Sequence, residues 1–172
     1  FRYFSRTFKS SPESVGATTA WIREMAERLQ LESDHVFHLD LCATELLANV
    51  AEHGSRATEA DVELGLLLDR DIAVVTIVDS GPEFDPVTYI EASSPSALLN
   101  AAPRGGFGLR LVREFSDGLV YSREGNCNRI TVRIVRPSKR QEPRRQADDN
   151  WSEIVSRSSL FRELPQDLAT GI

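Results

Sequence analysis

The hydrophobic and polar positions in the first half of the chain follow two different periods, which predict one strand and two helices. Residues 1–9 alternate aromatic and polar side chains, as an edge strand does. Pro12 then opens a helix. Asp34 is the expected N-cap of a second helix, which runs to about His53, and Gly54 supplies its stop. Apolar residues at helical spacing define the two buried faces: Val15, Trp21, Ile22, Met25 and Leu29 in the first helix, and Val36, Leu39, Ala43, Leu46 and Val50 in the second.

The middle of the chain predicts a hairpin followed by a long loop. Residues 62–68 and 72–78 are apolar and rich in β-branched side chains, and the turn signal Asp69-Arg70-Asp71 lies between them. Residues 80–104 contain several prolines and one short helical piece, expected at 97–100. A loop of this length inside a compact domain is usually functional.

A third helix and a closing hairpin complete the pattern. Residues 107–116 predict the helix, and residues 118–122 and 129–135 predict two strands joined at a Gly125-Asn126 turn. The resulting order is strand, helix, helix, strand, strand, loop, helix, strand, strand. This order predicts an α+β two-layer sandwich, in which helices cover one face of a mostly antiparallel, mixed sheet.

The last third of the chain differs in composition from the rest. We expect one folded domain over residues 1–136 and a polar linker over residues 137–150, where a basic cluster leaves binding of nucleic acid or lipid open. Residues 151–172 predict an amphipathic helical segment, which needs a surface to pack on. Its apolar residues are Trp151, Ile154, Val155, Leu160, Phe161 and Leu164.

Composition narrows the possible classes of protein. A chain of 172 residues that is 41% hydrophobic can bury the core of one compact domain. Its formal net charge of −6 argues against general nucleic-acid binding, which needs a basic footprint. No apolar run approaches the roughly 20 residues of a membrane span. Cys42 and Cys127 lack metal-ligand spacing, which favours reduced thiols in a cytoplasmic protein.

Three polar residues on the second helix are the first candidates for chemistry. Glu45 and Asn49 lie four residues apart and share a helix face, and His53 follows on the same face one turn later. A carboxylate and a carboxamide can hold Mg²⁺ through oxygen ligands and activate a nucleophile. A polar stripe on a solvated face is the alternative, although the apolar residues around this pair favour burial.

Asp79 ends the most hydrophobic strand of the chain and is the second candidate. Its carboxylate could accept a hydrogen bond from the exocyclic amine of adenine, while Gly81 lets the backbone approach the ring. The same residues, Asp79-Ser80-Gly81-Pro82, also form a good turn sequence without any ligand. Both interpretations stay open at this point.

The third candidate is the stretch Arg104-Gly105-Gly106-Phe107-Gly108-Leu109, which opens the third helix. Its glycines expose backbone N–H groups beside a helix N-terminus, where the helix dipole favours an anion, and Arg104 adds a cation suited to a terminal phosphate. A dinucleotide-binding interpretation fails, because the glycines of a dinucleotide-binding motif follow the first strand of a βαβ unit. The glycines of this chain come late, after the proline-containing loop. A flexible turn is the remaining alternative.

Taken in order, these motifs resemble those of the anti-sigma-factor serine kinases of bacterial partner-switching systems. This family is a branch of the ATPase superfamily that includes gyrase, heat-shock protein 90, histidine kinases and mismatch-repair proteins. The resemblance covers about residues 1–136 and rests on residues 45–54, 79–86 and 105–112. Within the second stretch, Phe84-Asp85 after the glycine also matches the family pattern, whereas Glu83 stands where the family often has glycine. The resemblance implies a Bergerat-type ATP-binding fold.

The resemblance also implies a reaction and partners. The γ-phosphate of ATP would go to a serine of an anti-anti-sigma (STAS-type) protein, and the chain, as a homodimer, would sequester a sigma factor. Glu45 would be the general base, and Asn49 would bind Mg²⁺. The remaining nucleotide-binding residues implied by the resemblance are His53, Asp79, Gly81, Phe84, Asp85, Arg104, Gly105, Gly106, Phe107, Gly108 and Leu109.

Three alternatives remain open. The chain could be the catalytic part of a sensor histidine kinase, or a nucleotide-gated binding module without transferase activity. Residues 158–168 resemble the leading helix of a cyclic-nucleotide-binding domain, which would make the chain, starting at Phe1, a fragment of a longer protein. The alternative for this segment is a helix that docks on the kinase core or on a second copy of the chain.

Overall fold

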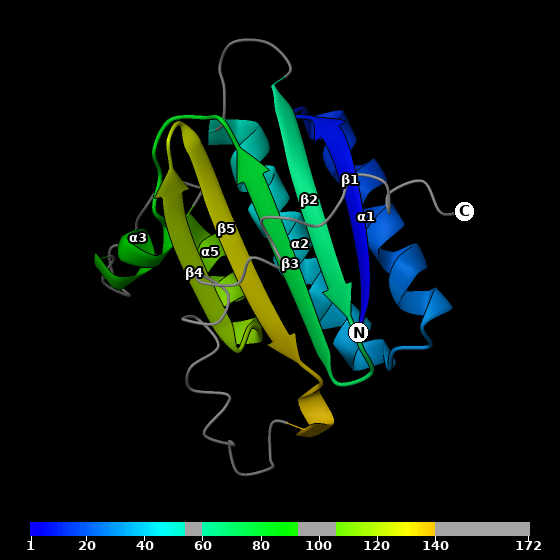
Figure 1. The fold of residues 1–172 in the computed structure, drawn as a ribbon. Coiled ribbons are helices and arrows are strands. Elements are labelled where there is room, and N and C mark those ends of the chain that lie inside the picture. The colour runs from blue at the N-terminus through cyan, green and yellow to red at the C-terminus, as the bar shows by residue number, and fades with distance from the viewer. Residues whose placement is uncertain (54–59, 93–105, 140–172) are drawn as a thin grey trace.

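The computed structural model describes residues 1–53, 60–92 and 106–139, which form one sheet and its covering helices (Figure 1). The elements in chain order are β1 (Arg2–Lys9), α1 (Pro12–Arg28), α2 (Ser33–His53), β2 (Asp61–Leu68), β3 (Ile72–Asp79), α3 (Pro86–Ala92), α5 (Gly106–Phe115), β4 (Gly118–Glu124), β5 (Cys127–Val135) and a short 3₁₀ helix, η1 (Pro137–Lys139). None of the helices among these residues is long and apolar enough to cross a bilayer.

The five strands form one sheet in the order β1-β2-β3-β5-β4, and every neighbouring pair is antiparallel. Helices α1, α2 and α5 lie on one face of it (Figure 1). This arrangement confirms the predicted α+β sandwich. The sheet is more regular than the mixed sheet we expected, because β5 lies between β3 and β4 and pairs antiparallel with both.

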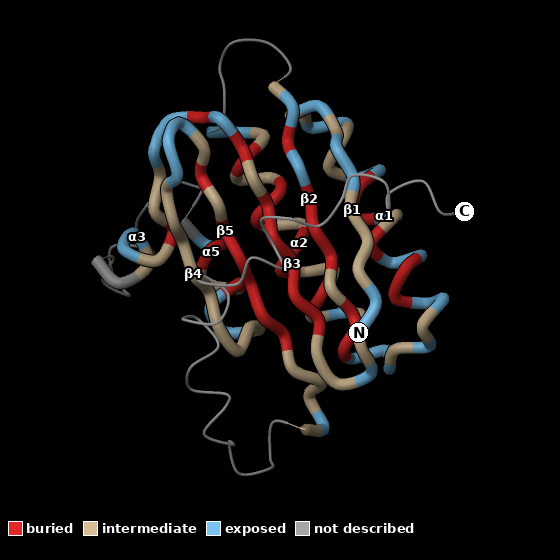
Figure 2. Tube along the Cα trace, viewed as in Figure 1, coloured by how far each residue is buried: buried red, intermediate tan, exposed pale blue. Residues whose placement is uncertain are grey.

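The core lies between α1, α2 and α5 and the inner face of the sheet (Figure 2). Both predicted helical stripes point into it. Ile22, Met25, Leu39, Ala43, Leu46 and Val50 are buried, and Val15, Trp21, Leu29 and Val36 pack against them half-buried. Alternate residues of the strands face these helices: Leu64 and Leu66 in β2, Val75 and Ile77 in β3, and Val132 and Ile134 in β5.

Several boundaries differ from the sequence-based expectation. Helix α2 begins at Ser33, so Asp34 lies inside its first turn and does not cap it. An acidic residue is also favourable there, because it interacts with the helix dipole. Strand β5 begins at Cys127, and the predicted turn is confirmed at Gly125, whose φ of +59° suits glycine.

Helix α3 lies within the segment that the sequence predicted to be a loop. Asp85 explains it, because Oδ1 accepts hydrogen bonds from the Val87 and Thr88 backbone N–H groups at 2.9 and 3.2 Å. Pro86 follows as the first helical residue, where its missing N–H costs nothing. The helical piece expected at 97–100 lies outside the described residues.

Most of the residues in the predicted linker and C-terminal helical segment also lie outside the described residues. Arg136, at the end of the predicted domain, forms ion pairs with Glu32 at 2.7 Å and Asp71 at 2.9 Å. The first three residues of the predicted linker form η1. The remaining linker and the segment 151–172, with its possible cyclic-nucleotide-binding motif, stay predictions.

His35 should make the stability of this fold depend on pH. Its side chain is fully buried, its Nε2 lies 3.3 Å from the Ile134 carbonyl oxygen, and its Nδ1 has no hydrogen-bond partner among the described residues. Burial lowers the pKa of His35 below 6.5, and the positive charge of Arg136 lowers it further. The hydrogen bond with the Ile134 carbonyl and two nearby carboxylates raise this pKa, but by less. The unfolded chain therefore binds a proton at a higher pH than the folded chain does.

The contribution of neutral His35 to the free energy of unfolding should be complete above the pKa of this histidine in the unfolded chain. Below that pKa, we expect the free energy of unfolding to decrease as the pH falls. Urea unfolding at about pH 7.5 and about pH 5.5 measures the difference. His35→Phe should reduce the pH dependence of unfolding, whereas His53→Gln, at an exposed position on the same helix, should leave it unchanged. A pH dependence that His35→Phe leaves intact would assign the effect to other groups.

Candidate functional site

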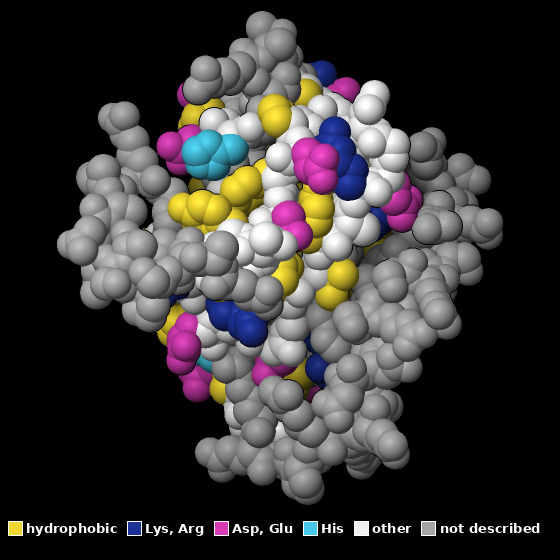
Figure 3. Space-filling model, turned by 90° about the vertical axis from the view of Figure 1, so that its left-hand side faces the viewer, with side chains coloured by type: hydrophobic (Ala, Val, Ile, Leu, Met, Phe, Trp, Pro, Cys, Tyr) yellow, Lys and Arg dark blue, Asp and Glu magenta, His cyan; other side chains and the backbone are white. Residues whose placement is uncertain are grey.

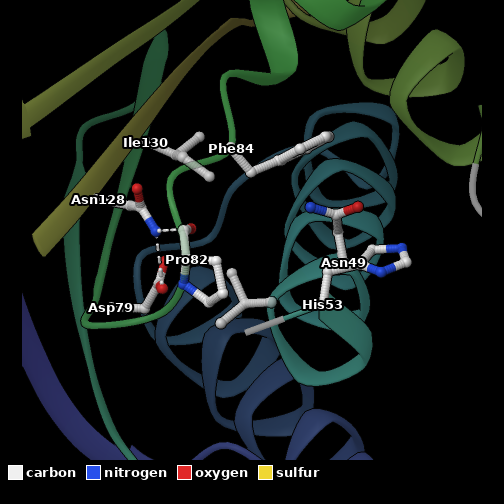
Figure 4. Close-up of a pocket in the computed structure, with 8 residues that line it drawn as sticks. Asn49, His53, Asp79, Pro82, Phe84, Asn128 and Ile130 are labelled. Carbon is white, nitrogen blue, oxygen red and sulfur yellow. Dashed lines mark hydrogen bonds between the residues drawn. The ribbon is translucent and has the colours of Figure 1, made fainter. Parts of the chain in front are cut away.

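A small pocket lies where the C-terminal half of α2 faces the end of β3 and the start of β5 (Figure 4). The structure thus brings together four residues that the sequence proposed as nucleotide contacts: Asn49, His53, Asp79 and Phe84. The pocket holds about 20 Å³, which is room for roughly one water molecule, so a purine base can enter only if these walls move apart. The full lining is Asn49, Val50, His53, Asp79, Pro82, Phe84, Asn128 and Ile130.

Asp79 is the buried carboxylate of this pocket. It is 6% exposed, and its Oδ1 accepts hydrogen bonds from the Gly81 N–H at 2.7 Å and from Asn128 Nδ2 at 3.0 Å. The Gly81 bond closes the Asp79–Gly81 turn, so the turn interpretation of this sequence is correct. Oδ2 accepts no hydrogen bond from any residue that the structure describes. The turn therefore leaves one carboxylate oxygen available to a ligand.

Asn128 is the residue of this site that the sequence did not reveal. It is the cross-strand partner of Asp79, is 3% exposed, and points into the pocket (Figure 4). One signal was present: Asn128 has the same strand parity as Ile130 and Val132, which face the core. A polar side chain at such a position needs a hydrogen-bond partner, and here that partner is Asp79.

The predicted polar face of α2 runs along one side of the pocket. Glu45 and Asn49 are half-buried, and His53 is exposed at the end of the helix. The rings of His53 and Phe84 lie 6.3 Å apart, and the Phe84 ring lies 5.6 Å from that of Tyr89 in α3. The pocket rim is therefore aromatic. Hydrophobic side chains lie at the surface beside a histidine on the side of the molecule shown in Figure 3.

Glu45 lies against the first turn of α5 and not in the pocket lining. A Cβ atom placed on Gly108 would overlap the Glu45 carboxylate oxygen and lie 2.9 Å from its Cδ. The glycine at position 108 is thus the reason that this carboxylate can occupy its place beside the helix N-terminus. The Glu45 carboxylate and the opening of α5 therefore adjoin each other.

The remaining predicted residues occupy different environments. Leu109 is 2% exposed and belongs to the core, whereas Phe107 is 65% exposed. Asp85 caps α3, with Oδ2 accepting the Thr88 hydroxyl hydrogen bond at 2.7 Å. Gly106 is the first residue of α5. Arg104 and Gly105 lie outside the described residues, and their proposed contacts with phosphate stay predictions.

Comparison with known proteins places these features in a family. A family model described as "Histidine kinase-like ATPase domain" matches residues 8–134. The chain is 34% identical over 125 residues to serine/threonine-protein kinase BtrW of Bordetella bronchiseptica, a match that covers 69% of this chain and 87% of that protein.

Two solved structures with similar folds are both histidine kinases. One is the histidine kinase domain of the Erythrobacter litoralis EL346 blue-light activated histidine kinase, with 18% identity, a TM-score of 0.44 and coverage of 73% of this chain and 62% of that one. The other is the Acinetobacter baumannii histidine kinase AdeS, with 14% identity, a TM-score of 0.41 and coverage of 80% and 70%. The family model itself spans most of the chain. This protein therefore belongs to the histidine kinase-like ATPase domain family.

Proposed function

We propose that this chain binds Mg²⁺ and ATP in the pocket beside Asp79 and transfers the γ-phosphate to a serine of a partner protein. The observation that supports ATP binding best is the buried Asp79 carboxylate, with Oδ1 bonded inside the protein and Oδ2 available at the pocket. The relative named as a serine/threonine-protein kinase supports the choice of a serine hydroxyl as acceptor.

The base-binding part of the proposal follows from hydrogen-bond polarity. A carboxylate oxygen only accepts, so Asp79 Oδ2 suits the exocyclic amine of adenine. Gly81, whose N–H donates to Asp79 Oδ1, is buried, and the absence of a side chain there lets the backbone approach a ring. The Phe84 and His53 rings at the rim provide apolar faces for the same base.

The phosphate part involves α2 and the start of α5. Asn49 offers an oxygen ligand for Mg²⁺, which in nucleotide sites takes its other ligands from phosphates and water. The free N–H groups at the start of α5, around Gly106 and Gly108, suit phosphate oxygens, and Arg104 would add a positive charge. Bound Mg²⁺ would supply neutralisation of phosphate charge. Among the described residues, no group of three or more His, Cys, Asp or Glu side chains could hold a metal.

Glu45 is the proposed general base. Its carboxylate lies beside Gly108 at the start of α5, where it could accept the proton of an incoming serine hydroxyl. The rest of the catalysis would consist of positioning and electrostatic stabilisation. We further propose, from the resemblance of the motifs, that the acceptor is an anti-anti-sigma protein and that the chain sequesters a sigma factor as a homodimer.

Replacing Asp79 tests the nucleotide site. In Asp79→Asn, the side-chain oxygen can keep the Gly81 and Asn128 hydrogen bonds, which leaves an N–H₂ group facing the adenine amine. Two donors then face each other, so we expect ATP affinity to fall by about 1–3 kcal/mol in isothermal titration calorimetry. Asp61→Asn, at an exposed position in β2, is the matched control and should bind ATP as the wild type does. Unchanged affinity of Asp79→Asn for both ATP and ADP would place the nucleotide elsewhere.

A further inference from the structure

Three side chains from the closing hairpin meet behind the pocket carboxylate. Asn128 of β5 accepts hydrogen bonds at its Oδ1 from the Tyr121 hydroxyl at 2.9 Å and from Arg123 at 2.6 Å. Tyr121 and Arg123 both belong to β4, and all three side chains are buried or half-buried. We call Tyr121, Arg123 and Asn128 the hairpin clamp. Neither its tyrosine nor its arginine lines the pocket itself.

The clamp leaves the Asn128 amide only one orientation. A guanidinium group has five N–H donors and no acceptor, so the amide atom that Arg123 contacts must be the oxygen. The Tyr121 hydroxyl then donates to the same oxygen. The N–H₂ group is consequently turned toward Asp79, where it donates to Oδ1 at 3.0 Å.

The same residues also hold the chain that follows Asp79. Asn128 Nδ2 donates to the Pro82 carbonyl at 2.9 Å and lies 3.4 Å from the Gly81 carbonyl, while Arg123 donates to the Gly81 carbonyl at 3.2 Å. Both the Asp79 carboxylate and the backbone beside it are thus attached to the closing hairpin. A rotation of the carboxylate would break bonds with Gly81 and Asn128 together.

We propose that the hairpin clamp sets the hydrogen-bond polarity of the base pocket. With the amide orientation fixed, Asp79 Oδ1 is occupied by donors and Oδ2 faces the ligand as an acceptor. The pocket therefore selects a purine that presents an N–H donor at position 6, and rejects a 6-oxo purine, which would present an acceptor there. This inference rests on the proposed ATP site and assigns Tyr121, Arg123 and Asn128 as positioning residues for it.

The test compares ATP with purine riboside triphosphate, which lacks the 6-amino group but keeps the ring and the phosphates. In the full chain with Mg²⁺, Asn128→Ala should raise the Kd for ATP roughly tenfold to a hundredfold, because Asp79 loses a charge-assisted hydrogen bond and its fixed orientation. The Kd for purine riboside triphosphate should stay within about twofold. The preference for ATP over inosine triphosphate, a 6-oxo analogue, should shrink as well.

A second variant keeps the test independent of folding. Tyr121→Phe removes one hydroxyl group and keeps the ring, and it should weaken ATP binding roughly two- to tenfold with purine riboside triphosphate unaffected. Asn126→Ala, at an exposed position in the β4–β5 turn, is the matched control and should bind all three nucleotides as the wild type does. Thermal unfolding verifies that each variant is folded.

The outcomes separate this inference from the function on which it rests. If Asn128→Ala and Tyr121→Phe weaken both nucleotides equally, or leave ATP binding unchanged, the hairpin clamp has no role in base polarity although the ATP site stands. If the wild-type chain binds none of the three nucleotides, the proposed function is wrong and the inference fails with it.

Discussion

Replacing Glu45 with alanine is expected to lower phosphotransfer about 10²- to 10⁴-fold while ATP binding is retained. A positioned general base contributes a factor of about this size, and Glu45 is not among the residues that line the base pocket. Phosphate transfer from labelled ATP measures the rate, and calorimetry measures the affinity. Glu52→Ala, an exposed carboxylate one turn from Asn49 on the same helix, is the control and should be fully active. Full activity of the Glu45 variant would show that another group accepts the proton.

Replacing Gly108 with alanine should separate activity from stability. The added methyl group would occupy the place of the Glu45 carboxylate, which must then move. A displacement of about 1 Å can lower the rate about 10²-fold. The free energy of unfolding should nevertheless stay the same or rise, because alanine is better than glycine in a helix by roughly 0.5–1 kcal/mol.

Gly16 provides the matched control for this substitution. It also lies in a helix, and a Cβ atom there has no neighbour within 4 Å. Gly16→Ala should therefore gain the same stability without losing any activity. If Gly108→Ala phosphorylates its partner as fast as Gly16→Ala does, the position of the Glu45 carboxylate has no influence on the reaction. If Gly108→Ala loses stability and Gly16→Ala does not, then the helix, and not the carboxylate, moves to accommodate the methyl group.

The regular elements were predictable because their periods come from local geometry. The stripe of α2 and the alternation of β2 and β3 each repeat over many residues, and tertiary contacts only reinforce them. Both hairpins carry turn residues that suit the observed backbone, such as Gly125 with its positive φ. Helix α3 was missed because its prolines were interpreted as a loop, although Asp85-Pro86 is a good helix start.

The polar and aromatic residues of the pocket that belong to α2 or to the Asp79–Phe84 stretch were proposed from the sequence, whereas a partner from a distant strand was not. Glu45, Asn49 and His53 lie on one helix, so their spacing alone places them on one face. Asn128 contacts Asp79 across 49 positions of sequence, and this contact exists only because β5 inserts between β3 and β4. The side chain of Leu109 packs in the core, and its predicted contact with the nucleotide stays a prediction.

The family membership and the geometry lead to one account of function, in which the base binds in the pocket beside the end of α2 and the phosphates bind between α2 and the start of α5. Asp79 and the hairpin clamp would read the base. Glu45, one turn before Asn49 on α2, and Gly108, beside it in the first turn of α5, would act where the phosphates lie. Asn49 lines the pocket and lies one turn from Glu45 on α2. Changes at the base pocket should therefore alter nucleotide affinity, and changes at Glu45 or Gly108 should alter the rate.

The central claim is that this chain is an ATP-dependent serine kinase, and transfer of labelled phosphate tests it most directly. The chain would be incubated with γ-labelled ATP, Mg²⁺ and a candidate anti-anti-sigma (STAS-type) protein, with Glu45→Ala in parallel. The account predicts acid-stable phosphoserine on the partner protein, strongly reduced for the variant. Acid-labile phosphohistidine, or tight ATP binding with no label on the partner, would contradict it, favouring a sensor histidine kinase in the first case and a nucleotide-gated binding module in the second.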